Sequence, residues 1–311
     1  MRYLHRYTLH LSPIVLAWII GLFLAACQSP KKGFDIEEVP EQQDYIESLS
    51  GNSQQIGDSS NDNAGDHSQE TESNQDSTGF FPKIIAHRGY WHAEGACQNS
   101  LAGISAAAAL GADGIDFDLW KTKDDSVVVA HDATHGGMNI LNTKYADLAK
   151  VPLENGEPLP TLRAFLECVR NYPDLILFFE LKTHVAAEPV LNIYRAFDLP
   201  NPALFMSFDA KACQKIIAAD KTLPVLILRS SGNPDDPTDL LKQGYTGLAY
   251  QHGYLKNNLS VLEEGKALGL SFALWTANST SLYDWAREEE ISYFITDDPA
   301  GILKYRRKLI L

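Results

Sequence analysis

Cysteine is scarce in this 311-residue sequence, which contains only four. No two of them have the spacing of a structural metal site, which argues against a zinc-stapled fold. Cys27 follows the N-terminal apolar run, and the other three cysteines are Cys97, Cys168 and Cys213. An odd number in an exported chain leaves at least one outside an intramolecular disulfide. Cys168 and Cys213 fall in helix-like apolar patterns, which predicts small buried core residues.

Basic charge is also in deficit, since 26 Lys and Arg face 40 Asp and Glu. The imbalance is uneven along the chain, because residues 34–78 hold twelve of the acids and no Lys or Arg. The chain from residue 79 onward is only mildly acidic. Neither part offers the basic surface that binding to nucleic acid requires, so that class of function is excluded.

The N-terminus lacks an apolar run long enough to cross a membrane. The apolar run covers the eleven residues 14–24, whereas a helix that spans a membrane needs about 20 apolar residues. This difference argues against the alternative of an uncleaved membrane anchor. With Arg2 and Arg6 before the run, the pattern predicts a signal peptide over residues 1–26. The Leu-Ala-Ala-Cys order ending at Cys27 resembles the bacterial lipoprotein cleavage box. That resemblance implies a lipid on Cys27 and a membrane-anchored protein of the bacterial cell envelope, facing the periplasm or the exterior.

Residues 27–79 contain few large apolar side chains. Ser, Asn, Gln, Asp, Glu and Gly dominate this stretch, and residues 39–49 are its one candidate for a short helix. Such a composition cannot bury enough surface to offset the entropy of ordering. We therefore expect an acidic, disordered tether that holds a folded domain away from the membrane.

Residues 80–311 alternate between short apolar runs and helix-like patterns. Repeated strand–helix units predict a parallel sheet covered by helices, and this length fits a closed (β/α)₈ TIM barrel. A doubly wound open sheet is the alternative, but no glycine-rich phosphate loop follows the first predicted strand. Residues 133–160 are polar with weak periodicity. They predict a small insertion after the strand that ends in His131.

Titratable side chains stand at the ends of four successive predicted strands. Barrel enzymes place their chemistry at such strand ends, so we expect these side chains to share one mouth. They are His87, Arg88, Asp116, Asp118, His131, Glu180 and Lys182.

Three of these residues are candidate metal ligands. Asp116 and Asp118 are alternate residues of one strand, so both carboxylates face the barrel interior, and Glu180 has the same geometry one strand further on. Three carboxylates held together repel one another unless a cation lies between them. Oxygen ligands favour Ca²⁺ or Mg²⁺ over zinc. The alternative is a set of solvated charges at strand ends.

The remaining four suit proton transfer and anion binding. His87 and His131 are candidates for general base and general acid, because imidazole titrates near physiological pH. Arg88 and Lys182 supply positive charge that can hold phosphate oxygens. Two imidazoles, two cations and a metal together favour chemistry on a phosphodiester, since the charges offset those that develop on the phosphoryl oxygens.

An ordered series of motifs resembles the glycerophosphodiester phosphodiesterase family. The family implies a TIM barrel, His87 and His131 as the catalytic pair, and a metal on Asp116, Asp118 and Glu180. It also implies phosphate contacts from Arg88 and Lys182, and a substrate contact from Trp275. The motifs are His87-Arg88-Gly89, Asn99-Ser100, residues 111–118, Thr122-Lys123-Asp124, residues 128–132, Leu159-Pro160-Thr161-Leu162, Glu180-Leu181-Lys182, Trp275-Thr276 and residues 295–299.

Two positions depart from the family pattern. Asp116 stands where a glutamate is usual, which shortens one metal ligand by a methylene and favours the more flexible Ca²⁺ shell over Mg²⁺. Gln98 replaces a glutamate and loses a charge while keeping its hydrogen-bonding capacity. We expect activity with a shifted metal preference.

Three functions remain open from the sequence. The first is metal-dependent hydrolysis of a small glycerophosphodiester to an alcohol and sn-glycerol 3-phosphate. The second is a phospholipase C-like or sphingomyelinase D-like enzyme on the same barrel, with an apolar lip from Tyr90, Trp91 and Met138. The third is a degenerate barrel that binds phosphodiesters without turnover, for which Asp116 and Gln98 are the only support.

Overall fold

The computed structural model describes residues 79–183 and 185–311. The predicted signal peptide, the predicted lipidation site Cys27 and the predicted tether up to residue 78 lie outside this part of the chain. Within the described part, no helix is both long enough and apolar enough to cross a membrane.

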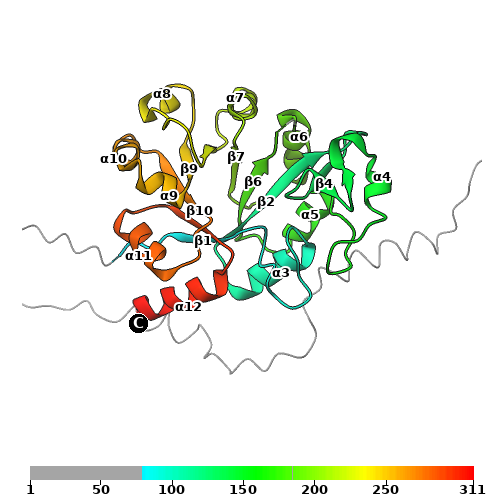
Figure 1. The fold of residues 1–311 in the computed structure, drawn as a ribbon, viewed down its shortest axis with the longest axis horizontal. Coiled ribbons are helices and arrows are strands. Elements are labelled where there is room, and N and C mark those ends of the chain that lie inside the picture. The colour runs from blue at the N-terminus through cyan, green and yellow to red at the C-terminus, as the bar shows by residue number, and fades with distance from the viewer. Residues whose placement is uncertain (1–78, 184) are drawn as a thin grey trace, which may run out of the picture. The chain divides into compact units, whose positions relative to one another are not determined.

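Eight parallel strands close into a barrel with helices around it (Figure 1), which confirms the predicted (β/α)₈ fold. The barrel closes because β1 pairs with both β2 and the last strand, β11. The open-sheet alternative is therefore wrong. The strands are β1 (Lys83–Ala86), β2 (Gly114–Lys121), β6 (Ile176–Leu181), β7 (Ala203–Ser207), β8 (Val225–Arg229), β9 (Gly247–Gln251), β10 (Ser271–Trp275) and β11 (Tyr293–Thr296).

The helices between the strands form the outer layer. Several begin at capping residues visible in the sequence, such as Ser100 and Thr161, whose side chains accept hydrogen bonds from the first turn. The helices are α3 (Leu101–Leu110), α5 (Leu162–Val169), α6 (Ala187–Phe197), α7 (Ala210–Ala219), α8 (Pro237–Lys242), α9 (His252–Lys256), α10 (Leu259–Ala267), α11 (Thr280–Glu288) and α12 (Pro299–Ile310).

Strand alternation determines which side chains reach the barrel interior. In β2, Ile115 and Phe117 join the large apolar core between strands and helices, so Asp116 and Asp118 must face inward. In β6, Phe178 belongs to the small core inside the barrel, and Glu180 lies on the same face of that strand. The pattern that buries the outer core thus directs three carboxylates to the interior.

The predicted insertion is present and has a small core of its own. The strand β3 (Val127–Val129) turns back antiparallel on β2, and the chain then forms a short hairpin and two short helices before α5. Val128, Ile140, Leu148 and Leu159 make its apolar core. The elements are β4 (Thr134–His135), β5 (Met138–Asn139), a 3-10 turn η1 (Ile140–Asn142) and α4 (Tyr145–Leu148).

The three cysteines in the described residues are buried and form no disulfide. Cys168 and Cys213 pack in the outer core, as their helical patterns predict. The fold is therefore held by its apolar layers rather than by covalent links.

Candidate active site

The first catalytic candidates lie in the loop between β1 and α3, here named the β1–α3 loop (residues 87–100). Arg88 has φ +57°, a left-handed conformation that is uncommon for residues other than glycine. This conformation directs the Arg88 backbone N–H to the carboxylate of Asp116. Gly89 follows with φ +78°, and a side chain there would meet the backbone of Gly103 at 3.0 Å. The chain therefore turns tightly against α3 and keeps His87 and Arg88 at the mouth.

The carboxylate of Asp118 contacts three side chains at the mouth. It accepts a hydrogen bond of 2.9 Å from Asn99 Nδ2, pairs with Lys182 Nζ at 2.7 Å, and lies 3.6 Å from Arg88 Nε. Burial opposes its ionisation, but Lys182 and Asn99 outweigh burial and hold the pKa of Asp118 below its ordinary value. Asp118 is therefore an anion surrounded by donors.

Glu180 and Asp116 are buried with less compensation. Burial, reinforced by the charge of Asp118, raises the pKa of Glu180 to about 7 although Lys182 opposes the shift. Burial and Asp118 also raise the pKa of Asp116, against the influence of His87 and Arg88. Both carboxyl groups therefore lie where another positive charge would favour their ionised forms.

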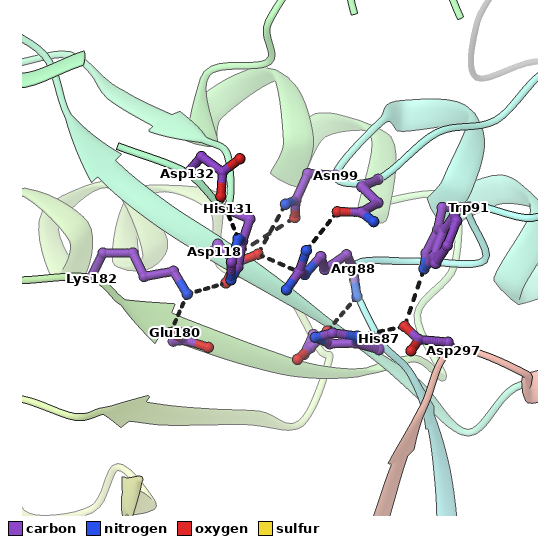
Figure 2. A network of polar contacts seen from close by, with 12 residues as sticks. His87, Arg88, Trp91, Asn99, Asp118, His131, Asp132, Glu180, Lys182 and Asp297 are labelled. Atoms are coloured by element: carbon purple, nitrogen blue, oxygen red, sulfur yellow. Dashed lines mark hydrogen bonds and ion pairs between the residues drawn. The ribbon is translucent and has the colours of Figure 1, made fainter. Parts of the chain in front are cut away.

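Lys182 lies among the candidate metal ligands. Its ammonium contacts both Asp118 and Glu180 (Figure 2). The donor set fits a hard divalent cation in its chemistry, since the three carboxylates supply only oxygen and the pKa values of Asp116 and Glu180 stay raised despite the nearby cations. Their present side-chain positions do not converge on one point, and no group of three His, Cys, Asp or Glu in the described residues has the geometry of a metal site. An ion bound here would therefore displace the ammonium.

His87 is oriented by a carboxylate that follows the last strand of the barrel. Its Nδ1 lies 2.6 Å from Asp297 Oδ1, just beyond the end of β11. Asn278 and Trp91 donate to the same carboxylate at 3.0 and 3.4 Å. Burial lowers the pKa of His87, but Asp116 and Asp297 outweigh it, so the pKa lies above its ordinary value. With Nδ1 engaged by Asp297, Nε2 is the ring nitrogen left for substrate.

His131 has a similar but more exposed partner. Its Nδ1 lies 2.8 Å from Asp132 Oδ1, and its backbone carbonyl accepts from Trp120 Nε1 at 3.0 Å. Burial lowers the pKa of His131, and Lys182 and Arg88 lower it further, whereas Asp118 opposes the shift. The two imidazoles therefore have pKa values displaced in opposite directions.

A cavity of about 530 Å³, partly open to solvent, lies at this mouth. Its lining divides into two halves. The polar half comes from the early strands and consists of His87, Arg88, Asp116, His131, Glu180 and Lys182; the apolar half comes from the later strands and consists mainly of Met206, Phe208, Leu228, Trp275 and Ile295. All eight residues predicted from the sequence thus gather here, with Asp118 just beneath the lining.

Trp275 anchors the apolar half. Its indole N–H donates to the Ala249 carbonyl at 2.8 Å, and its ring meets Phe208 edge to face with centroids 5.6 Å apart. Phe208 remains 45% exposed, so its ring presents apolar surface at the edge of the cavity. By contrast Tyr90, Trp91 and Met138, the lip expected for the lipase alternative, do not line this cavity.

Four residues that line the cavity or contact the predicted site residues were given no role from the sequence. Asn99 and Asp297 fall within motifs that carry the family resemblance, so a signal existed, but only the fold shows what they contact. Asp132 adjoins a predicted catalytic histidine and could have been inferred by proximity. Phe208 follows β7 with no motif around it, and only the structure brings it to the mouth.

The departure at Gln98 has a visible consequence. Arg88 Nη1 donates to Gln98 Oε1 at 2.6 Å. A neutral amide orients the guanidinium through this bond without offsetting its charge. Arg88 therefore keeps more of its attraction for an anion than it would beside a glutamate.

Barrels of this kind hold enzyme active sites at the carboxyl ends of their strands. This mouth adds paired imidazoles and two cations, which suit acid–base chemistry on an anionic substrate. The fold and the site therefore define the protein as a barrel enzyme.

Comparison with known proteins identifies the family. The model of the glycerophosphoryl diester phosphodiesterase family matches residues 87–301, which is more than half of the chain. A glycerophosphodiester phosphodiesterase of Caldanaerobacter subterraneus is 24% identical over 243 residues, which are 72% of this chain and 98% of the relative. The chain belongs to the glycerophosphodiester phosphodiesterase family, and it is an enzyme.

Solved structures agree with this assignment. A glycerophosphodiester phosphodiesterase from Parabacteroides distasonis is 30% identical with a TM-score of 0.71, over 75% of this chain and 99% of that one. An Oleispira antarctica phosphodiesterase, solved in complex with the product sn-glycerol-3-phosphate, has the same fold. It has a TM-score of 0.65 and 23% identity, over 74% of this chain and 99% of that one.

Proposed function

We propose that this enzyme hydrolyses small glycerophosphodiesters to an alcohol and sn-glycerol 3-phosphate, with His87 and His131 as the acid–base pair. The observation that carries the proposal is the pairing of each imidazole with its own carboxylate, Asp297 or Asp132, at the polar half of one cavity. The product complex of the Oleispira phosphodiesterase supports the choice of product.

The two histidines divide the proton transfers between them. One accepts a proton from the attacking water, and the other donates a proton to the oxygen of the departing alcohol. Each carboxylate engages Nδ1 of its ring, so Nε2 is the nitrogen that exchanges protons with substrate. Arg88 and Lys182 hold the phosphoryl oxygens, where negative charge accumulates during the reaction.

We assign Asp116, Asp118 and Glu180 as ligands of a divalent cation, Ca²⁺ or Mg²⁺. When bound, such an ion offsets charge on the phosphoryl oxygens as a Lewis acid. The support is the chemistry of the donors, three buried carboxylates of which two have raised pKa values. Binding the ion would free Lys182 from Asp118 and Glu180, and its ammonium could then contact phosphate.

Turnover assays test these assignments. We expect hydrolysis of glycerophosphocholine to require a divalent ion, to stop with chelator, and to be lost in both His87→Ala and His131→Ala. Full activity in either variant would overturn the histidine pair. Unchanged activity after exhaustive chelation would overturn the metal assignment alone, because the histidine result does not depend on it.

The lipase alternative predicts a different product and a different substrate. In that reaction a substrate hydroxyl attacks to give a cyclic phosphate, which phosphorus NMR distinguishes from sn-glycerol 3-phosphate. The absence of Tyr90, Trp91 and Met138 from the lining favours small, deacylated substrates. Cleavage of intact lipid with a cyclic product would reverse this preference.

We also propose that Cys27 carries a lipid and anchors the enzyme in the cell envelope. The support is the order of basic residues, apolar run and Leu-Ala-Ala-Cys box. Mass spectrometry of the N-terminal peptide should find the modification on Cys27, and Cys27→Ser should release the protein from membranes. An unmodified Cys27 in membrane-bound protein would contradict the proposal.

A further inference from the structure

We infer that Glu157, in the insertion, is a positioning residue that braces the β1–α3 loop and thereby sets the geometry of Arg88 and Asn99. This inference rests on the proposed function, since it concerns the same site. Glu157 touches none of the residues proposed to react with substrate, and it does not line the cavity. Glu157 contacts the backbone N–H groups at the start of α3, and through them it acts on Arg88 and Asn99 in the β1–α3 loop.

The contact of Glu157 with α3 is bidentate. Leu101 N donates to Oε2 at 2.7 Å, and Ala102 N donates to Oε1 at 3.0 Å. These two N–H groups open the helix, where donors are otherwise unsatisfied and the helix dipole favours an anion. Ser100 caps the next available N–H, that of Gly103, at 3.0 Å. Helix α3 therefore has one cap from its own Ser100 and a second one supplied by the insertion.

Asn155 extends the brace to the outer part of the same loop. Its Nδ2 donates to the Gly95 carbonyl at 3.0 Å and to Glu157 Oε1 at 2.9 Å. Its Oδ1 accepts from Glu157 N at 3.2 Å, which stabilises the turn that presents both side chains. The insertion thus contacts the β1–α3 loop at two points.

The β1–α3 loop needs this support because its backbone is strained at Arg88 and Asn99. Asn99 has φ +60° and Arg88 has φ +57°, and such conformations persist only where the surroundings enforce them. The two residues are joined by a hydrogen bond of 2.9 Å from Asn99 N to the Arg88 carbonyl. Asn99 also orients Asp118, so a shift at the start of α3 would reach a carboxylate and a guanidinium together.

Small shifts of this kind are costly in an active site. A displacement of about 1 Å can lower turnover by about 10²-fold. Loss of Glu157 should therefore lower kcat, and it should raise KM because Arg88 would no longer be held for the phosphate. A role confined to the stability of α3 would lower the melting temperature and leave both constants unchanged.

The test compares four full-length proteins: the parent, Glu157→Ala, Glu157→Gln and Glu154→Ala. The last is a matched control, because Glu154 is exposed in the same turn and forms no hydrogen bond with the described residues. Two properties are measured: kcat and KM on glycerophosphocholine with Ca²⁺ or Mg²⁺, and amide hydrogen exchange at Arg88 and Asn99, whose N–H groups do not touch Glu157.

We expect kcat to fall at least tenfold in Glu157→Ala, less in Glu157→Gln, and not in Glu154→Ala. Exchange at the Arg88 and Asn99 amides should accelerate in the same order. A kcat within twofold of the parent in Glu157→Ala, or unchanged exchange at both amides, would overturn the inference. If the parent itself hydrolyses no glycerophosphodiester, the proposed function fails, and the exchange data still decide whether the brace exists.

Discussion

The two halves of the mouth differ in the kind of contact that holds their side chains. In the polar half, each of Asp118, Glu180, His87 and His131 has at least one charged partner, and the network continues from strand to strand. In the apolar half the contacts are those of packing, and Phe208, which is 45% exposed, meets Trp275 edge to face. A half cross-linked by charged groups suits reacting atoms that need fixed geometry, whereas an apolar half suits the carbon part of a substrate.

The comparison is tested most strongly by removing an imidazole from the polar half. We expect His87→Ala and His131→Ala each to lower kcat on glycerophosphocholine by about 10²- to 10⁴-fold, the range of acid–base catalysis. Steady-state assays with the folded variants, checked by circular dichroism, measure the effect. A loss below tenfold in either variant would mean that this imidazole does not transfer a proton in the slow step.

The second test keeps the imidazole and removes its partner. In Asp297→Asn the amide loses the charge that engages His87 Nδ1, so the ring can adopt the wrong tautomer or orientation. Losses of such partners commonly amount to about 10- to 100-fold, so we expect a drop in kcat of that size with KM nearly unchanged. The control is Asp298→Asn, because Asp298 is the next residue and caps α12 rather than contacting His87. Equal losses in the two variants would refute the orienting role.

The third test addresses the apolar half alone. Phe208→Ala removes the edge-to-face partner of Trp275 and one wall of the cavity. We expect a rise in KM of about tenfold or less, from an aromatic contact of about 0.5–1.5 kcal/mol, and little change in kcat. The rise should vary with the alcohol part of the substrate in a panel of glycerophosphodiesters. A fall in kcat with KM unchanged would contradict the division of the mouth into two halves.

The smallest expected effect is a pH dependence of stability at Asp297. Hydrogen bonds from His87, Asn278 and Trp91 outweigh burial and lower the pKa of Asp297 to about 2. Because the folded pKa lies below the ordinary value of 3.8, Asp297 stabilises the fold above pH 4, and this contribution disappears as pH falls toward 2. Urea unfolding of the parent and Asp297→Asn should therefore show a stability difference that narrows over this range. A difference independent of pH would count against the lowered pKa.

The sequence was sufficient for the fold and for the set of residues that gathers at the mouth. Alternating apolar runs predicted the barrel, and strand periodicity predicted that Asp116 and Asp118 share a face, because both signals are local. The motif series then placed His131, Glu180 and Trp275 at the same mouth. Helices α6 and α12 were not predicted, although their apolar positions face the outer core.

The partners of the reacting residues were harder to predict. Asp297 lies 210 positions from His87, and Glu157 lies more than fifty positions from the helix it caps. No local periodicity encodes such pairings, since they arise only when the barrel closes and the insertion packs on α3. The contacts of Lys182 with Asp118 and Glu180 are equally invisible in sequence, because its charge suits a phosphate and a carboxylate alike.

The position of the Lys182 ammonium between Asp118 and Glu180 has a consequence for how the protein matures. The chain carries its own counter-ion for the buried carboxylates, so the barrel can complete its folding before any metal arrives. Small metal-stapled domains behave differently, since they unfold when the ion is withdrawn. Under the proposed metal dependence, acquisition of shape is therefore separate from acquisition of activity, and a chelator should silence the enzyme while leaving the barrel folded.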